Sequence, residues 1–235
     1  MPKAIKKRVP KKTGDTEAEV QERLSGLKDT FKERQKTVLQ IFAGIVIIGI
    51  AVVGFLVYSS TAQKKARLLE YEGYKTYYSN QQAQSPNKEE QYQKALDMFK
   101  KAYDAKSSPF SLFYIAACYY ELGKYDDALR TLKEFTQKYA EDDRFIPLAY
   151  QKMALTYIKK GDLNEAKKPL DALYNLKGDI FKDFALMEYG RILEKEGKVE
   201  EAKKKYEELA KKFPTSPFID EVRAKLVERR KVKAP

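Results

Sequence analysis

The feature that most constrains this sequence is a pattern of small and large residues that recurs around three glycines. Gly123, Gly161 and Gly197 are 38 and 36 residues apart. An alanine follows each glycine after five residues, and a large residue follows that alanine after four more. A small residue also lies seven positions before each glycine. The spacing predicts repeated pairs of antiparallel helices, because small residues let helices approach closely and glycine lets the chain leave the first helix in a left-handed conformation.

The pattern resembles the tetratricopeptide repeat, a helix–turn–helix unit with a usual period of 34 residues. The alanines are Ala128, Ala166 and Ala202, the large residues after them are Leu132, Leu170 and Tyr206, and the small residues before the glycines are Ala116, Ala154 and Gly190. The glycine spacings of 38 and 36 residues exceed this period, and we assign the additional residues to inter-repeat loops at 140–144 and 177–179. A degenerate first hairpin contains Gly73 and Phe99, and a charged last helix is expected from Pro217 to about Lys231. The resemblance implies an all-α solenoid of about four helical hairpins with a C-terminal capping helix.

A second feature is the uncharged stretch from Val38 to Tyr58, which has 21 residues. As a helix it would be about 31 Å long, close to the thickness of a bilayer core. A buried core helix would rarely be so long without a charge. A cleaved signal peptide is the stronger alternative, since Ser60-Thr61-Ala62 offers a small-x-small site, but 37 residues precede the stretch and favour an uncleaved anchor. We therefore predict a tail at 1–37, a transmembrane helix at 38–58 and a tetratricopeptide-like domain at 59–235.

Charge predicts the orientation of this anchor. Residues 1–37 carry eleven Lys and Arg, whereas Lys64, Lys65 and Arg67 are the basic residues close behind the stretch. The more positive flank stays cytoplasmic, so the repeat domain is expected on the far side of the membrane. Within the tail, an apolar stripe from Val20 to Phe31 predicts a short amphipathic helix. That helix could lie on the membrane, pair with a partner helix or extend the span.

The composition excludes several chemistries. The chain has no His, which removes His-based triads, His metal sites and the usual general base at neutral pH. Carboxylate pairs such as Asp126 and Asp127 fall where helices should start, a position that the helix dipole favours. The net charge of +12 is scattered among interleaved Glu residues, which is typical of solvated faces rather than a nucleic-acid track. We predict a protein that is not an enzyme, holds no cofactor or metal and binds no nucleic acid; Cys118 is expected to be a buried small residue.

What remains is a surface for protein partners. In tetratricopeptide arrays the first helices of the hairpins line a concave groove, and the resemblance places nine residues there: Phe110, Phe113, Ala117, Tyr120, Gln151, Leu155, Lys159, Met187 and Arg191. The clamp for peptide C-termini in some family members needs Lys and Asn where this chain has Phe113 and Ala117, so capture of a C-terminal carboxylate is not expected. For each aromatic residue, ordinary packing is the alternative interpretation.

The layout as a whole is similar to the YfgM-type ancillary subunit of the bacterial SecYEG translocon. The similarity rests on the order of basic tail, single span, degenerate first hairpin and divergent repeats, and on the stretch LDALYNLKGDIFKDFALMEYGRILEKEGKVEEAKKKYEEL at residues 170–209. It implies a bacterial inner-membrane protein whose periplasmic domain meets the Sec translocon, translocated client proteins and periplasmic chaperones. The alternative is a tetratricopeptide scaffold for outer-membrane assembly or cell division, which is usually soluble or a lipoprotein. The sequence predicts no oligomeric state.

Overall fold

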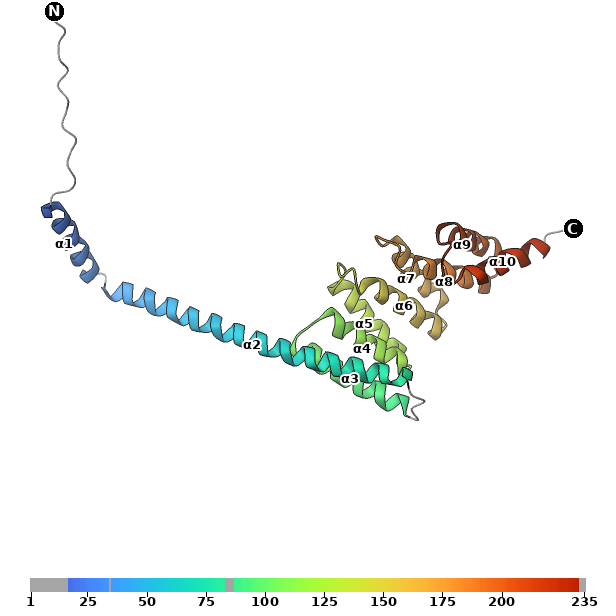
Figure 1. Cartoon of the computed structure of the whole chain (residues 1–235), viewed down its shortest axis with the longest axis horizontal. Helices are drawn as coiled ribbons and strands as arrows, with labels where there is room; N and C mark the ends of the chain where they lie inside the picture. Colours follow the sequence, from blue (N-terminus) through green and yellow to red (C-terminus); the bar gives the residue numbers. More distant parts are fainter. Residues whose placement is uncertain (1–16, 34, 83–86, 233–235) are drawn as a thin grey trace, which may run out of the picture. The chain divides into compact units, whose positions relative to one another are not determined.

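The computed structural model describes residues 17–33, 35–82 and 87–232, and every regular element in these ranges is an α-helix (Figure 1). The helices are α1 (Glu17–Glu33), α2 (Gln35–Gln82), α3 (Lys88–Ala105), α4 (Pro109–Glu121), α5 (Tyr125–Lys138), α6 (Ile146–Lys160), α7 (Leu163–Asn175), α8 (Lys182–Lys195), α9 (Val199–Lys212) and α10 (Ile219–Val232). The chain divides into two units between Ser60 and Thr61.

The first unit contains α1 and the N-terminal part of α2. Helix α1 covers the predicted amphipathic stretch, and the side chains of Val20, Leu24 and Leu27 are exposed on it. The side chain of Phe31 and the most basic part of the tail, residues 1–16, lie outside the described residues. The apolar stripe of α1 therefore has no partner among the described residues of this unit.

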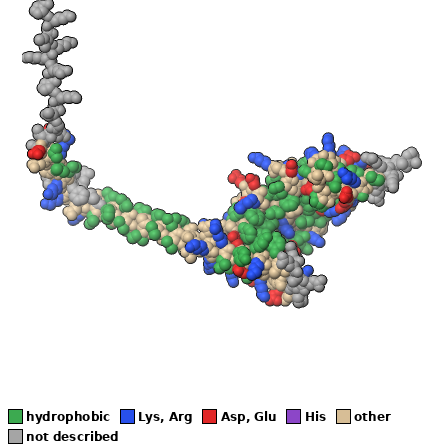
Figure 2. Space-filling view, in the orientation of Figure 1, with side chains coloured by type: hydrophobic (Ala, Val, Ile, Leu, Met, Phe, Trp, Pro, Cys, Tyr) green, Lys and Arg blue, Asp and Glu red, His purple; other side chains and the backbone are tan. Residues whose placement is uncertain are grey.

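Helix α2 contains the uncharged stretch. It is long and apolar enough to cross a membrane, and its most apolar part is not buried against any described residue. Figure 2 shows hydrophobic side chains covering this part of the helix. The helix does not stop at residue 58, because neither glycine nor proline occurs between Gly54 and Gly73. The predicted boundary at residue 59 thus falls inside a continuous helix.

The second unit is a stack of helical hairpins, which follow one another in chain order in Figure 1. The C-terminal part of α2 contacts α3 through Gly73 against Phe99 and through Thr76 against Met98. The following hairpins are α4–α5, α6–α7 and α8–α9, and α10 packs on α9. The structure confirms the prediction of an all-α tetratricopeptide-like solenoid with four hairpins and a final helix. Cys118 is fully buried in the core of this unit, as expected.

The three repeat glycines shape the turns inside the hairpins. Gly123, Gly161 and Gly197 have φ angles of 70°, 86° and 75°, a left-handed conformation that a side chain would strain. The N–H of the residue after each glycine donates to a carbonyl five residues earlier, at 2.9 Å in all three turns. This is the hydrogen bond of a Schellman motif, which closes the C-terminus of the preceding helix. The predicted role of the glycines is confirmed.

The close-packing points inside the hairpins are matched in size. The middle two hairpins combine an alanine on the first helix with a leucine on the second, whereas the outer two combine a glycine with a large ring. A Cβ atom placed on Gly190 would lie 2.4 Å from Cε1 of Tyr206, and one on Gly73 would lie 3.0 Å from Cε1 of Phe99. Each ring therefore fills the space that its glycine leaves empty.

Consecutive hairpins are also joined by polar contacts on their second helices. Lys138 of α5 donates to the hydroxyl of Tyr103 on α3 at 2.7 Å, and Tyr103 donates to Glu134 at 3.1 Å. The same Tyr–Glu–Lys trio joins α7 to α9 through Tyr174, Glu208 and Lys212. The first hairpin is thus tied to the second, and the third to the fourth.

The boundary between the second and third hairpins has no such trio. The equivalent positions on α5 and α7 are Thr136, Ala172 and Leu176, which cannot form a Tyr–Glu–Lys trio. The apolar core nevertheless runs through this boundary, since a single buried cluster includes Leu132 of α5 and Leu170 of α7. The two halves of the array therefore share a core but lack this polar link.

Candidate functional site

A groove of about 550 Å³ opens between the second unit's part of α2, the loop before α4 and the start of α6. We call it the basic groove and define it by three cationic side chains, Arg67, Lys106 and Arg144, and by three apolar ones, Phe110, Phe145 and Leu148. These residues come from three segments that are distant in the sequence. Only Phe110 belongs to the set predicted from the repeat pattern.

The apolar floor of the basic groove is held by ring contacts. The rings of Phe110 and Phe145 meet edge to face at 5.9 Å between centroids. Phe110 also packs on Tyr114 at 4.7 Å and on the buried Phe99 at 6.1 Å. Because Phe110 is half-buried, part of its ring supports the core and part faces the groove. A ring fixed in this way is a suitable anchor for a partner's apolar side chain.

A carboxylate and two serines order one wall of the groove. Glu70 of α2 accepts a hydrogen bond from the hydroxyl of Ser111 at 2.7 Å and another from Ser108. Ser108 is also the N-cap of α4 and accepts from the backbone N–H of Ser111 at 3.0 Å. These bonds tie α2 to the N-terminus of α4. The charge of Glu70 is therefore partly satisfied within the protein.

Three of the nine predicted groove residues are buried. Phe113 is 7% exposed, Ala117 2% and Met187 0%. The ring of Phe113 packs edge to face on Phe135 at 6.4 Å between centroids, and Met187 belongs to the core cluster that α10 completes through Val222. For these three residues the structure shows packing, and their side chains present little or no surface to a partner.

Tyr120 and its surroundings form a polar cluster. Nζ of Lys152 lies 4.4 Å from the centroid of the Tyr120 ring and 3.8 Å from a carboxylate oxygen of Glu121. The hydroxyl of Tyr77 donates to the same carboxylate at 3.2 Å. Burial lowers the pKa of Lys152, although Glu121 opposes that shift. The half-buried ring of Tyr120 is thus already occupied on one face by a lysine of its own chain.

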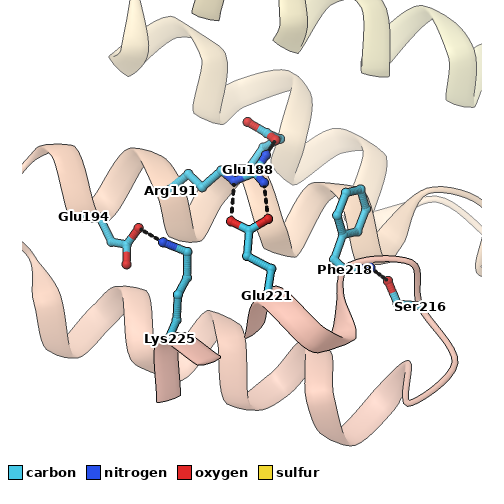
Figure 3. A network of polar contacts seen from close by, with 7 residues as sticks. All are labelled: Glu188, Arg191, Glu194, Ser216, Phe218, Glu221 and Lys225. Carbon is cyan, nitrogen blue, oxygen red and sulfur yellow. Dashed lines mark hydrogen bonds and ion pairs between the residues drawn. The ribbon is translucent and has the colours of Figure 1, made fainter. Parts of the chain in front are cut away.

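Arg191 is occupied by the capping helix. Its guanidinium donates to the carboxylate of Glu221 on α10 at 2.6 Å and 3.3 Å, and to Glu188 at 2.5 Å (Figure 3). Lys225 of α10 adds a bond of 2.8 Å to Glu194. The guanidinium of Arg191, which the resemblance places in the partner groove, is therefore already paired with Glu221 of α10 and with Glu188 of its own helix.

The remaining predicted residues lie on α6. Gln151 and Leu155 are half-buried and Lys159 is exposed. They keep some surface, so their part in partner binding stays a prediction. The basic groove was not predicted as a unit, because its cationic residues lie on a helix preceding the first full repeat and in two loops. A usable signal was the stretch Arg144–Leu148, where a charge and an aromatic ring precede a helix that has a proline in its first turn.

No site for a metal or a reactive thiol emerges from the part of the chain that the structure describes. Within residues 17–33, 35–82 and 87–232, no three Cys, Asp or Glu side chains gather closely enough to hold a metal ion. Burial raises the pKa of the Cys118 thiol, and Glu121 adds to that shift. The thiolate is therefore disfavoured, which makes Cys118 a packing residue rather than a nucleophile.

The comparisons with known proteins identify the fold. The profile of the tetratricopeptide repeat-like domain matches residues 28–228. No curated protein matches the sequence. Among solved structures, a double mutant of MamA from RS-1 superposes with a TM-score of 0.52 at 13% identity, covering 73% of this chain and 98% of that one. MamA from AMB-1 gives a TM-score of 0.51 at 13% identity, with 69% and 79% covered. At this identity the likeness concerns the fold alone, whereas the profile spans most of the chain: the protein belongs to the tetratricopeptide repeat-like domain family, whose arrays are scaffolds for protein–protein interaction.

Proposed function

We propose that this scaffold is a single-pass protein of the bacterial inner membrane and an ancillary subunit of the Sec translocon, of the YfgM type. In this proposal α2 crosses the membrane, the basic tail stays in the cytoplasm and the array lies in the periplasm. The array receives translocated proteins and passes them to periplasmic chaperones. The proposal rests on the layout of the chain and on the resemblance of residues 170–209 to that family.

The observation that carries the proposal is the sequence position of the basic groove. Its first lining residue, Gln63, follows the end of the uncharged stretch at Tyr58 by five residues. A binding surface that begins so soon after an anchor suits a protein that meets polypeptides as they leave the membrane. The charge asymmetry of the flanks supports the orientation.

Site-specific photocrosslinking in the native host tests this function. A photoreactive amino acid replaces Leu148 or Lys106 in the full-length protein, both of which line the basic groove. A matched control carries the same amino acid at Lys101, an exposed residue of α3 that does not line it. After irradiation of intact cells, mass spectrometry identifies the adducts.

We expect translocon subunits, periplasmic chaperones and exported proteins among the adducts of the groove positions and not among those of Lys101. Adducts with outer-membrane assembly or division proteins would instead support the alternative scaffold. Orientation is measured separately, by adding protease to spheroplasts. Digestion of residues 61–235 with protection of an N-terminal tag is expected, and the reverse pattern would overturn the periplasmic assignment.

A further inference from the structure

The basic groove carries an excess of positive charge that its own chain does not neutralise. Arg67, Lys106 and Arg144 line it, against the single carboxylate of Glu70. Arg67 and Lys106 are exposed and make no ion pair with any residue that the structure describes. Arg144 does pair with Asp142, at 3.2 Å, but its side chain is 79% exposed. At least two cations therefore remain available to a ligand.

The backbone adds to this positive potential. Helix α4 begins at Pro109 and helix α6 at Ile146, and the residues just before each start line the groove. The N-terminus of a helix carries a partial positive charge from its unpaired N–H groups. Both helices are longer than three turns, with 13 and 15 residues. Two helix starts and three cationic side chains thus face the same space.

The floor is apolar, which limits the kind of anion that fits. Phe110, Phe145 and Leu148 line the groove and are half-buried, whereas its three cationic side chains are exposed, and the two rings are fixed by the contacts described above. A small inorganic anion would leave this floor uncovered. The complementary ligand carries negative charge and a large apolar group side by side.

Glu70 favours a peptide over an isolated phosphodiester group. A phosphodiester offers only acceptors and a negative charge, so it would be repelled by a carboxylate in the wall. A peptide offers backbone N–H donors, which a carboxylate oxygen can accept, next to acidic side chains that pair with the cations. The groove's volume of about 550 Å³ is also within the usual range of ligand-binding clefts.

We propose that the basic groove binds an acidic internal segment of a partner protein, with Asp or Glu carboxylates on Arg67, Lys106 and Arg144 and one large apolar side chain on Phe110 and Phe145. This site rests on the proposed function only in needing a protein partner; it does not need the Sec translocon. A free C-terminus is not required, because the cations are grouped around an apolar floor and not arranged as a carboxylate clamp.

Peptide display on the purified protein tests the site. The full chain in phosphatidylcholine nanodiscs is panned against random ten-residue peptides that are displayed internally, so that no free carboxyl terminus is presented. The most enriched peptide is then labelled, and its affinity is measured by fluorescence anisotropy. A second peptide with Asn and Gln in place of its Asp and Glu reports the contribution of charge.

Two charge variants of the protein make the test specific. The first is the double variant Arg67→Gln with Lys106→Gln, which removes two cations from the rim. The control is Lys75→Gln with Lys101→Gln, which removes two exposed cations from α2 and α3 outside the groove. Both variants lose the same net charge, so a general electrostatic effect would appear in both.

We expect enriched peptides with net negative charge and at least one large apolar residue. The first variant should weaken binding on the order of tenfold, equivalent to about 1.4 kcal/mol, and the control should leave it unchanged. The proposal is overturned if no peptide is enriched, if the neutral peptide binds equally well, or if both variants behave alike. It is also overturned if monomeric short-chain phosphatidylglycerol displaces the peptide, which would assign the groove to a headgroup. Absence of translocon crosslinks in cells, together with peptide binding here, would refute the proposed function and leave this site intact.

Discussion

The match between Gly190 and Tyr206 can be tested by a substitution that is usually stabilising. Replacing a helical glycine with alanine gains about 1 kcal/mol from helix propensity. At Gly190 the new Cβ would lie 2.4, 2.8 and 3.0 Å from three atoms of the Tyr206 ring, whereas unstrained carbon contacts are about 3.5–4.0 Å apart. Tyr206 is fully buried, so its ring cannot turn out into solvent. Overpacking of this kind costs roughly 1–3 kcal/mol, which exceeds the gain.

We therefore expect Gly190→Ala to lower the stability of the array by about 1 kcal/mol net, the difference between those two effects. In a unit of this size that corresponds to a fall in melting temperature of about 2–4 °C. The assay is thermal unfolding of the full chain in mild detergent, followed by circular dichroism. Gly73→Ala is the matched comparison, because its nearest ring atoms are 3.0–3.2 Å away. Its melting temperature should fall less than that of Gly190→Ala.

A double-mutant cycle decides whether the ring is the cause. Tyr206→Leu installs the residue type that the middle hairpins carry at this position. In that background Gly190→Ala should raise the melting temperature, because the alanine–leucine combination of the middle hairpins is restored. The sign of the effect thus reverses between the two backgrounds. Equal effects of Gly190→Ala with and without the ring would refute the size-matching argument.

Three further predictions use the same unfolding assay. Ala128→Leu should lower stability by roughly 1–3 kcal/mol through overpacking of a fully buried position; an unchanged melting temperature would mean that the repeat register is wrong. Gly161→Ala should cost about 1 kcal/mol, because φ is 86° there and a Cβ atom is strained in that region; a stabilised variant would contradict the turn assignment. Burial, with a smaller contribution from Glu121, raises the pKa of Tyr77, so above pH 10 the unfolded chain loses this proton and the folded chain keeps it. The free energy of unfolding should therefore fall as pH rises from 10 to 12. Tyr77→Phe should make this decrease with pH less steep by about 1.4 kcal/mol per pH unit. An unchanged pH dependence in the variant would show that Tyr77 ionises in the folded protein.

The helices and their close-packing points could be predicted because they depend on local sequence. Glycine at a left-handed turn and alanine at a helix crossing leave a signal at fixed spacing, and Gly161 and Ala166 lie where that signal places them. The end of the first helix could not be found in this way. No residue that stops a helix follows Tyr58 closely, so α2 continues to Gln82.

The candidate site was less predictable, because it depends on contacts between distant segments. The repeat pattern predicts on which side of its hairpin a residue lies. It does not predict which other helix covers that side. Met187 and Arg191 lie on the first helix of their hairpin, yet Met187 belongs to a buried cluster that α10 completes, and Arg191 pairs with a carboxylate of α10. Conversely, Arg67, Lys106 and Arg144 are 39 and 38 residues apart in the sequence, and only the stacking of the hairpins brings them to one groove.

The uneven distribution of the Tyr–Glu–Lys trios bears on how the array would come apart. In a solenoid, stability is approximately the sum of the repeats and of the interfaces between neighbours. The interface between the second and third hairpins lacks the outer polar link that its neighbours have but keeps the exposed ion pair of Lys160 with Asp126 at 2.7 Å, so we expect a partial opening to begin at the outer side of this interface. Opening would separate two modules of two hairpins each, and amide protons near this joint would exchange with solvent earlier than those deep inside either module. If a bound polypeptide pulled on the array, the middle of the array would then open first. The basic groove is built on the first two hairpins and the start of the third, so this opening would first remove its α6 wall.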